Sequence, residues 1–277
     1  MREFRLFNAD GQEFDLMRKD AFFHAPSGLG FSLDYTSIAA GYDFITAGEE
    51  EMQQKTVSGS MVFAGYRQYQ EFVRFCEKRP LRLAYKPLDR WYFIKCELVN
   101  IAKGEIETAS RKLIPAVDFL CFSTWYESVE VQKTQLDPGI GKRYPYQYPY
   151  SYAETAAGSI RFRLTGDLPS YCRLTIKGPC QNPYWALSQG GEILSRGKVS
   201  ARIPAEHRLV INSSPGSLEI AEYTDAGEYV QNRYQDSDFS TARFVILPVG
   251  ESTLTFSHDG TGVIDAFAEV ERLARTV

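Results

Sequence analysis

The three histidines have the most versatile chemistry in this chain, because a neutral imidazole binds metal ions and titrates near neutral pH. They are His24, His207 and His258. Zinc and non-haem iron sites combine several nitrogen, sulfur or carboxylate ligands at short spacing. Each histidine here stands without a second ligand at such a spacing. We therefore expect surface or loop histidines and no metal site.

Glycine-containing and acidic segments bear only a superficial likeness to cofactor and catalytic motifs. Gly28-Leu29-Gly30 and Gly139-Ile140-Gly141-Lys142 complete neither a dinucleotide fingerprint nor a phosphate loop, and we expect turns at both. Glu49-Glu50-Glu51 indicates a solvated acidic loop, since a glycosidase needs two carboxylates that face each other across a cleft. His258-Asp259-Gly260 is foremost a hairpin signal. The nucleophile sequence Gly-x-Ser-x-Gly is absent, so we expect no enzyme, no catalytic residues and no cofactor.

Aromatic side chains are the remaining candidates for a binding site, because amphipathic rings suit wet surfaces. Trp91 and Trp125 lie in strand-like segments, which favours core packing. Tyr184 and Trp185 follow Asn182-Pro183 in a loop-like context. We therefore expect Tyr184 and Trp185 to contact a glycan or a partner protein, if such a contact exists on this chain.

The cysteines and the first residues indicate synthesis in a cytoplasm. The five cysteines are odd in number and none are separated by two residues, which favours neither a disulfide framework nor a zinc knuckle. We expect most of them to act as small buried apolar residues. Residues 1–10 include the charged residues Arg2, Glu3 and Arg5 near their start and lack the apolar core of a signal peptide.

The overall composition is that of a globular chain rich in β-forming residues. Hydrophobic residues make up 44% and charged residues 24% of 277, and 18 Phe with 17 Tyr favour strands. This length suits two domains. The net charge is −4 and no Lys/Arg run exceeds two residues, so we expect no nucleic-acid partner. Apolar stretches fall short of the roughly 18 residues that cross a bilayer, so we expect no membrane insertion.

The first half of the chain combines strand patterns with one helical pattern. Helical spacing puts four apolar residues on one face of residues 66–78, namely Tyr69, Phe72, Val73 and Cys76. Period-two alternation predicts strands at residues 56–63, 91–99 and 117–122. We therefore expect a β domain with one packed helix over residues 1–134.

The second half begins after a stiff connector at residues 135–155, where five tyrosines between residues 144 and 152 alternate with proline and other residues. Short alternating patterns then predict strands at Ile160/Phe162, Leu174/Ile176, Leu209/Ile211, Leu218/Ile220, Phe244/Ile246 and Leu254/Phe256. Residues 263–272 suit either a closing strand or a helix. Turn residues separate these patterns, so we expect an antiparallel β-sandwich or jelly roll over residues 156–277.

In this order of elements the chain resembles the distal tail proteins of long-tailed bacteriophages and prophages. The first-domain segments that carry the resemblance are residues 57–63, Tyr69-Phe72-Val73-Phe75, 80–85, 91–98, 103–105, 117–119 and 125–126. The second-domain segments are Gly166-Asp167-Leu168-Pro169-Ser170-Tyr171 and residues 176–183. Each motif is moderately specific, and the order, the single helix and the connector position add to their weight.

The resemblance implies a structural virion protein of the phage tail without catalytic residues. It implies an N-terminal β domain that builds a ring, usually of six copies, between the tail tube and the tail-tip or baseplate proteins. It also implies a C-terminal jelly roll, similar to galectins and carbohydrate-binding modules, that is displayed for binding a partner or a host-surface glycan. Two alternatives stay open: a stand-alone carbohydrate-binding protein that uses the C-terminal sandwich, and a carbohydrate-active enzyme with an appended module.

Overall fold

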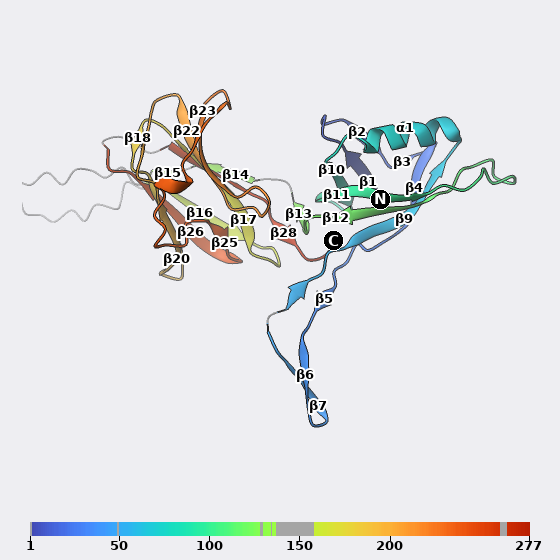
Figure 1. The fold of residues 1–277 in the computed structure, drawn as a ribbon, viewed down its shortest axis with the longest axis horizontal. Coiled ribbons are helices and arrows are strands. Elements are labelled where there is room, and N and C mark those ends of the chain that lie inside the picture. The colour runs from blue at the N-terminus through green and yellow to red at the C-terminus, as the bar shows by residue number, and fades with distance from the viewer. Residues whose placement is uncertain (1, 49, 128–129, 134, 137–157, 261–264) are drawn as a thin grey trace, which may run out of the picture. The chain divides into compact units, whose positions relative to one another are not determined.

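The structure is a computed structural model that describes residues 2–48, 50–127, 130–133, 135–136, 158–260 and 265–277 (Figure 1). It divides into two compact units: unit 1 is Met1–Ser128 with Leu273–Val277, and unit 2 is Val129–Arg272. The last five residues thus group with the first unit, whereas we expected them in the second domain. Most of the expected connector lies outside the described residues. The predicted mainly-β class with one packed α-helix is confirmed.

Unit 1 is built on one antiparallel sheet with the strand order β2-β1-β10-β11-β12-β9-β4-β3. Its strands are β1 (Glu3–Phe7), β2 (Glu13–Asp15), β3 (Met17–Arg18), β4 (Ala21–Ser27), β9 (Thr56–Phe63), β10 (Leu81–Lys86), β11 (Tyr92–Ala102), β12 (Ala116–Cys121), β13 (Trp125–Glu127) and β28 (Leu273–Ala274). β13 pairs with both β11 and β28. Leu16 joins β2 to β3, and its backbone bonds Phe4 and Phe23 at 3.0 and 2.8 Å, so the sheet curls around its core.

The helix α1 (Tyr66–Cys76) covers the core of unit 1 through the face that its sequence predicts. Phe72 and Cys76 are buried, and Tyr69 packs partly buried against the same cluster. The Phe72 ring lies 5.4 Å from that of Phe14 and 5.5 Å from that of Phe63, centroid to centroid. Helix and sheet therefore share one aromatic core.

Unit 2 consists mainly of two antiparallel sheets around a second core. The first has the order β14-β27-β17-β22-β23-β24, with β25 beside β17; the second has the order β15-β16-β26-β19-β20. The first contains β14 (Glu130–Lys133), β17 (Ser170–Lys177), β22 (His207–Asn212), β23 (Glu219–Thr224), β24 (Tyr229–Asn232), β25 (Ile246–Leu247) and β27 (Asp265–Val270). The second contains β15 (Gln135–Leu136), β16 (Gly158–Leu164), β19 (Tyr184–Gln189), β20 (Glu192–Lys198) and β26 (Gly250–Ser257). A short pair, β18 (Cys180–Gln181) with β21 (Arg202–Ile203), and the 3₁₀ helix η1 (Tyr234–Asp236) complete it.

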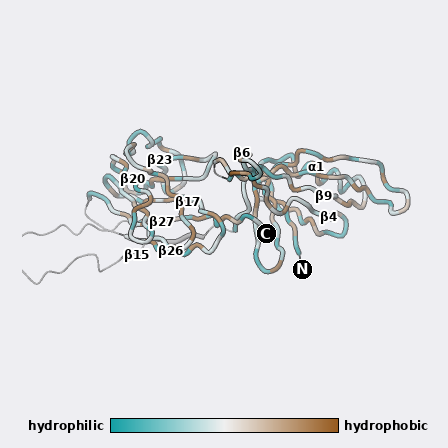
Figure 2. The backbone as a smooth tube through the Cα atoms, turned by 90° about the horizontal axis from the view of Figure 1, so that it is seen from below, coloured by the Kyte–Doolittle hydropathy of each residue, from teal (hydrophilic) through white to brown (hydrophobic). Residues whose placement is uncertain are grey.

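Hydrophobic and polar residues alternate along many of these strands; Figure 2 colours the backbone of both units by hydropathy. In β16 and β26, Ile160, Phe162, Leu254 and Phe256 are all buried as predicted. The expected alternation at Phe244/Ile246 is wrong in phase, because Val245 and Leu247 are the buried residues and Ile246 is exposed. The ambiguous C-terminal segment contains a strand, β27, rather than a helix.

Burial of the cysteines confirms their expected apolar role. All five are free and buried: Cys76, Cys96, Cys121, Cys172 and Cys180. Burial raises the pKa of the Cys121 and Cys180 thiols to about 11. These thiols therefore stay protonated and unreactive near neutral pH. Among the described residues, no helix is long and apolar enough to cross a membrane.

Candidate functional site

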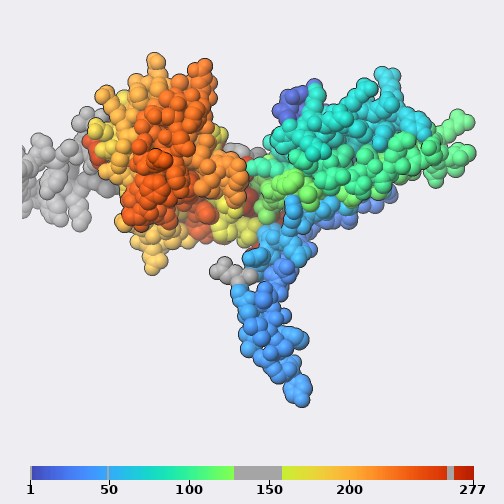
Figure 3. Space-filling model, in the orientation of Figure 1, coloured from blue at the N-terminus to red at the C-terminus, as the bar shows by residue number. Residues whose placement is uncertain are grey.

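A narrow arm, residues 31–52, projects from the sheet of unit 1 (Figures 1 and 3). It consists of two strand pairs, β5 (Leu33–Asp34) with β8 (Glu51–Met52), and β6 (Ser37–Ala40) with β7 (Asp43–Thr46). Ala40 pairs with Asp43, which leaves a two-residue loop at the tip. Gly41, at the first loop position, has φ +69°, a conformation that a tight hairpin turn requires and glycine adopts without strain.

The arm carries large apolar side chains that face solvent. Exposure is 105% for Tyr42, 77% for Phe44 and 60% for Ile45. The other exposed large apolar residues of the arm are Phe31, Tyr35 and Ile38. Clusters of exposed apolar side chains on one element are typical of contact surfaces. The arm therefore has the composition of a binding element rather than of a solvated loop.

The base of the arm is held by the C-terminal segment of unit 1. Arg275 donates from a guanidinium nitrogen to Glu50 Oε1 at 2.7 Å, and Tyr35 Oη donates to Glu50 Oε2 at 3.2 Å. The bond from Arg275, followed by that from Tyr35, lowers the pKa of the Glu50 carboxyl. Of the acidic run Glu49-Glu50-Glu51, expected as a solvated loop, Glu50 is thus a paired carboxylate and Glu51 belongs to β8; residue 49 lies outside the described residues.

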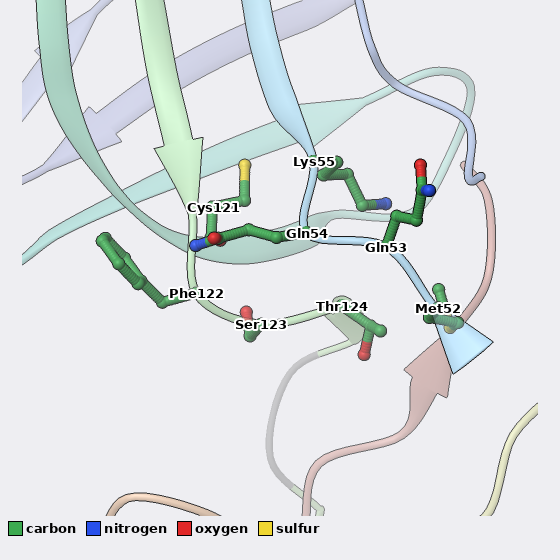
Figure 4. Close-up of a pocket in the computed structure, with 8 residues that line it drawn as sticks. All are labelled: Met52, Gln53, Gln54, Lys55, Cys121, Phe122, Ser123 and Thr124. Carbon is green, nitrogen blue, oxygen red and sulfur yellow. The ribbon is translucent and has the colours of Figure 1, made fainter. Parts of the chain in front are cut away.

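A pocket of about 320 Å³ lies beside the base of the arm (Figure 4). Two chain segments form its walls, Met52–Lys55 before β9 and Cys121–Thr124 after β12. Gln54 Nε2 donates to the Cys121 carbonyl at 3.0 Å, and the Cys121 amide donates to the Lys55 carbonyl at 2.9 Å. These bonds tie the two walls together, so the pocket is a fixed feature of unit 1.

Lys55 is the cationic residue of this pocket. Its Nζ donates to the Gly30 carbonyl at 2.9 Å and lies 5.7 Å from the centroid of the Trp125 ring. Among the described residues, no carboxylate forms an ion pair with this ammonium group. Partial burial lowers the pKa of Lys55, because desolvation disfavours the charged form. The pocket therefore offers a partly desolvated positive charge to an anionic group.

The sequence-predicted contact residues of unit 2 have different environments. Trp185 is 0% exposed, and its Nε1 donates to the Arg243 carbonyl at 2.9 Å. Its ring packs so tightly against Gly197 that a Cβ there would come within 2.3 Å. The prediction that Trp185 contacts a glycan or a partner is wrong for this reason: the indole is a core residue on β19. Tyr184 is half-buried at the start of that strand and keeps its predicted role as a proposal.

Of the two tryptophans of unit 1 that we expected in the core, Trp125 is a core residue and Trp91 is not. Trp125 is fully buried, and its Nε1 donates to the Leu29 carbonyl at 3.0 Å. Trp91 is only partly buried, because its ring lies beneath the Arg5 guanidinium at 4.7 Å and near the Lys86 ammonium at 5.7 Å. These cations cover its ring on the sheet surface in place of core side chains.

The histidines lie apart from one another. His24 is exposed, whereas His258 is in a loop but buried, with its Nδ1 accepting from the Gly260 amide at 3.1 Å. His207 contacts Glu222. No cluster of three or more metal-ligating side chains exists within the part of the chain that the structure describes. Gly28 has φ +75° and leads from β4 into irregular backbone with a bend at Gly30, where we expected a turn, and the predicted turn at residues 139–142 lies outside the described residues.

A buried ionic network holds the β23–β24 edge of unit 2. Glu222 is 1% exposed, and its Oε2 accepts from Arg233 at 2.6 and 2.8 Å and from Gln231 at 3.2 Å. Its Oε1 bonds His207 at 2.5 Å, and Arg233 also pairs with Asp236 at 3.0 Å. Burial alone would raise the pKa of Glu222, but the bonds from His207 and Arg233 outweigh it and the pKa is lowered. The Glu222 carboxylate and the Arg233 guanidinium find these partners within unit 2, which indicates a role in folding rather than in ligand binding.

Sequence reasoning missed the arm and the pocket for different reasons. Gly41-Tyr42 between short β-forming runs is a hairpin signal that could have located the arm. The pocket has no comparable signal, because Lys55 and Cys121 are far apart in the chain and meet through β9–β12 pairing.

Comparison with known proteins finds matches among phage tail and baseplate proteins. The family model of the distal tail protein N-terminal domain matches residues 3–122. A chain of the phage p2 baseplate in its activated conformation with Sr is 16% identical with a TM-score of 0.66, and the two chains are fully covered. The same values hold for the phage p2 baseplate with Ca.

The SPP1 Dit protein, described as a paradigm of the hub adsorption apparatus in phages infecting Gram-positive bacteria, is 12% identical with a TM-score of 0.65. Coverage is 97% of this chain and 98% of that one. At such identities the likeness to solved structures shows the fold alone. No curated protein matches the chain. Residues 3–122 are thus similar to the N-terminal domain of phage distal tail proteins.

Proposed function

We propose that this protein is a structural component of the virion tail that assembles into a ring, of six copies, between the tail tube and the tail-tip or baseplate proteins. Unit 1 builds the ring, and unit 2 is displayed for contact with a partner protein or a host-surface glycan. The match of residues 3–122 to the model of the distal tail protein N-terminal domain supports the place in the tail. The baseplate and hub origins of the similar structures support it further.

The exposed arm of unit 1 is the observation that carries this proposal. Covering a fully exposed Phe, Tyr or Ile side chain contributes about 1.5–3 kcal/mol each. Tyr42, Phe44 and Ile45 therefore gain little in an isolated chain and much in an assembly. A contact between the arm of one copy and a different surface of the next copy is heterologous, because the two copies contribute different surfaces. Heterologous contacts between identical chains close into rings when the rotation permits.

Aromatic rings at the surface of unit 2 support its display for contact with a partner or a glycan. Tyr184 remains its predicted contact residue, and Tyr229 and Phe239 are exposed aromatic rings on the same unit. A stand-alone carbohydrate-binding protein would use such rings without needing the arm. The arm favours the assembly role over this alternative.

The mass of the purified protein in solution, measured over a range of concentrations and in the presence of tail tubes, tests the ring. Six copies of a 31.4-kDa chain give about 188 kDa, and we expect this mass at high concentration or on the tube end. A monomer under all of these conditions, with saturable binding to glycans, would support the carbohydrate-binding alternative instead.

A further inference from the structure

The pocket and the tip of the arm carry complementary charges. Lys55 contributes an ammonium group to the pocket that no carboxylate pairs with among the described residues. Asp43, at the tip, is exposed and forms no side-chain ion pair or hydrogen bond with the described residues. Resting on the proposed ring, we propose that the pocket of one copy receives the arm tip of its neighbour, with Asp43 as the counter-ion of Lys55.

Apolar groups match on both sides of this ion pair. On the arm, Asp43 shares a strand face with Ile45 and its paired residue Ile38, both exposed, because alternate residues of a strand point to one face. At the pocket, Met52 and the exposed Phe122 lie beside Gln53, Ser123 and Thr124. A carboxylate beside exposed isoleucine side chains therefore meets an ammonium group flanked by apolar and hydroxyl side chains. Covering both sets excludes water from the ion pair, which strengthens the attraction between the charges.

The length of the arm makes the neighbouring copy, rather than the same chain, the source of the tip. Gly41 at the tip lies eight positions after Leu33 at the base. Paired strands rise about 3.3 Å per residue, so the tip lies roughly 25 Å from the base. The pocket includes Met52 of the basal pair itself. The tip could reach its own pocket only by breaking the β6–β7 and β5–β8 pairs. Figure 3 shows the arm as a straight ridge directed away from its base.

Exchange of the two charges is the most specific test. We expect Asp43→Lys and Lys55→Asp each to raise the concentration at half-assembly by about tenfold or more, as loss of a covered charge pair does. The double variant, which restores opposite charges, should recover assembly. Asp89→Lys and Lys112→Asp, both on exposed residues outside the arm and the pocket, make the same charge changes elsewhere and should leave assembly unchanged. Thermal unfolding of each variant checks that unit 1 remains folded.

A second measurement leaves the wild-type chain unaltered. A carbodiimide joins a carboxylate to an amine in direct contact, and a mixture of ¹⁴N- and ¹⁵N-labelled chains distinguishes links between copies from links within one. We expect a mixed-isotope Asp43–Lys55 link in the assembled protein. Wild-type rings without this link, together with unchanged assembly of both single variants, would overturn the contact and leave the ring intact. A wild-type chain that never assembles would instead contradict the proposed function and the contact with it.

Discussion

The arm of unit 1 and the β23–β24 edge of unit 2 are both short antiparallel hairpins, but they differ in the burial of their key side chains. At the edge, the Glu222 carboxylate is buried and every bond it needs comes from the same unit. Along the arm, Tyr42, Phe44 and Ile45 face solvent, and the described ion pair nearest the base is that of Glu50 with Arg275.

This difference separates the parts of the chain that stabilise a unit from the parts available to another molecule. A buried carboxylate with all its partners constrains the local fold, because removing any partner leaves an uncompensated charge. Exposed apolar residues contribute little to the unit that carries them. Substitutions in the two hairpins should therefore separate loss of stability from loss of assembly.

The largest effect on stability is expected for Glu222→Gln. The change leaves the largely buried Arg233 guanidinium without its main counter-charge, so we expect the free energy of unfolding to fall by about 3–5 kcal/mol. Chemical denaturation followed by circular dichroism measures it. The neighbouring Glu219→Gln replaces the partly exposed carboxylate that accepts from the Tyr223 hydroxyl with a neutral amide acceptor, and it should cost less than about 1.5 kcal/mol. Equal losses of unfolding free energy in both variants would show that the buried network stabilises unit 2 no more than the partly exposed Glu219–Tyr223 hydrogen bond does.

Acid should weaken the same network. The pKa of Glu222 is lowered in the folded chain relative to the ordinary value near 4.3. Its contribution is therefore fully present above the unfolded pKa and is lost as the pH falls through the folded pKa. We expect the free energy of unfolding to decline below about pH 4.3, and to decline less steeply in Glu222→Gln. Identical pH slopes in the two proteins would remove Glu222 from the acid response.

Tight packing in the core of unit 2 predicts a smaller loss for Gly197→Ala. The added Cβ would lie 2.3 Å from Trp185 Cζ2, and overpacking of this kind costs about 1–3 kcal/mol. Gly104→Ala is the matched control, since a Cβ there meets no atom within 4 Å. A red-shifted Trp185 emission in Gly197→Ala would report displacement of the indole, whereas unchanged stability would contradict the core role given to Trp185.

The smallest effect on stability is expected in the arm. Phe44→Ser and Tyr42→Ser alter exposed side chains, so we expect the free energy of unfolding of the dilute monomer to change by less than about 0.5 kcal/mol. Denaturation at a concentration below assembly makes this measurement. A loss comparable to that of Glu222→Gln would mean that the arm packs on its own unit and is not an assembly element.

The strands and the helix could be predicted from the sequence where hydrophobic residues recur with the period of the element and face one core. The period-two pattern of residues 56–63 and the helical face of Phe72 and Cys76 required no knowledge of distant partners. The alternation at Phe244/Ile246 misled because every residue from 244 to 247 is apolar, so the pattern fits both phases. There, contact with the core decides which side chain is buried.

The candidate site was much less accessible from the sequence. Trp185 has the residue type and the flanking Pro183 of a surface loop, but β19 pairs with both β20 and β26 and becomes an interior strand. The apolar residues of the arm have the composition of a buried hairpin, and only the structure reveals that nothing in the described part of the chain covers them. The Lys55 pocket depends on two segments that the β9–β12 pairing brings together.

Assembly through the arm is tested most directly by comparing the masses of wild type, Ile45→Ser and Ile193→Ser by light scattering at matched concentrations. Ile45 in the arm and Ile193 in β20 are equally exposed, at 60% and 59%, so the two substitutions differ chiefly in location. The account predicts about 188 kDa for wild type and Ile193→Ser and a shift toward 31.4 kDa for Ile45→Ser. Full assembly of Ile45→Ser, or equal dissociation of both variants, would contradict it.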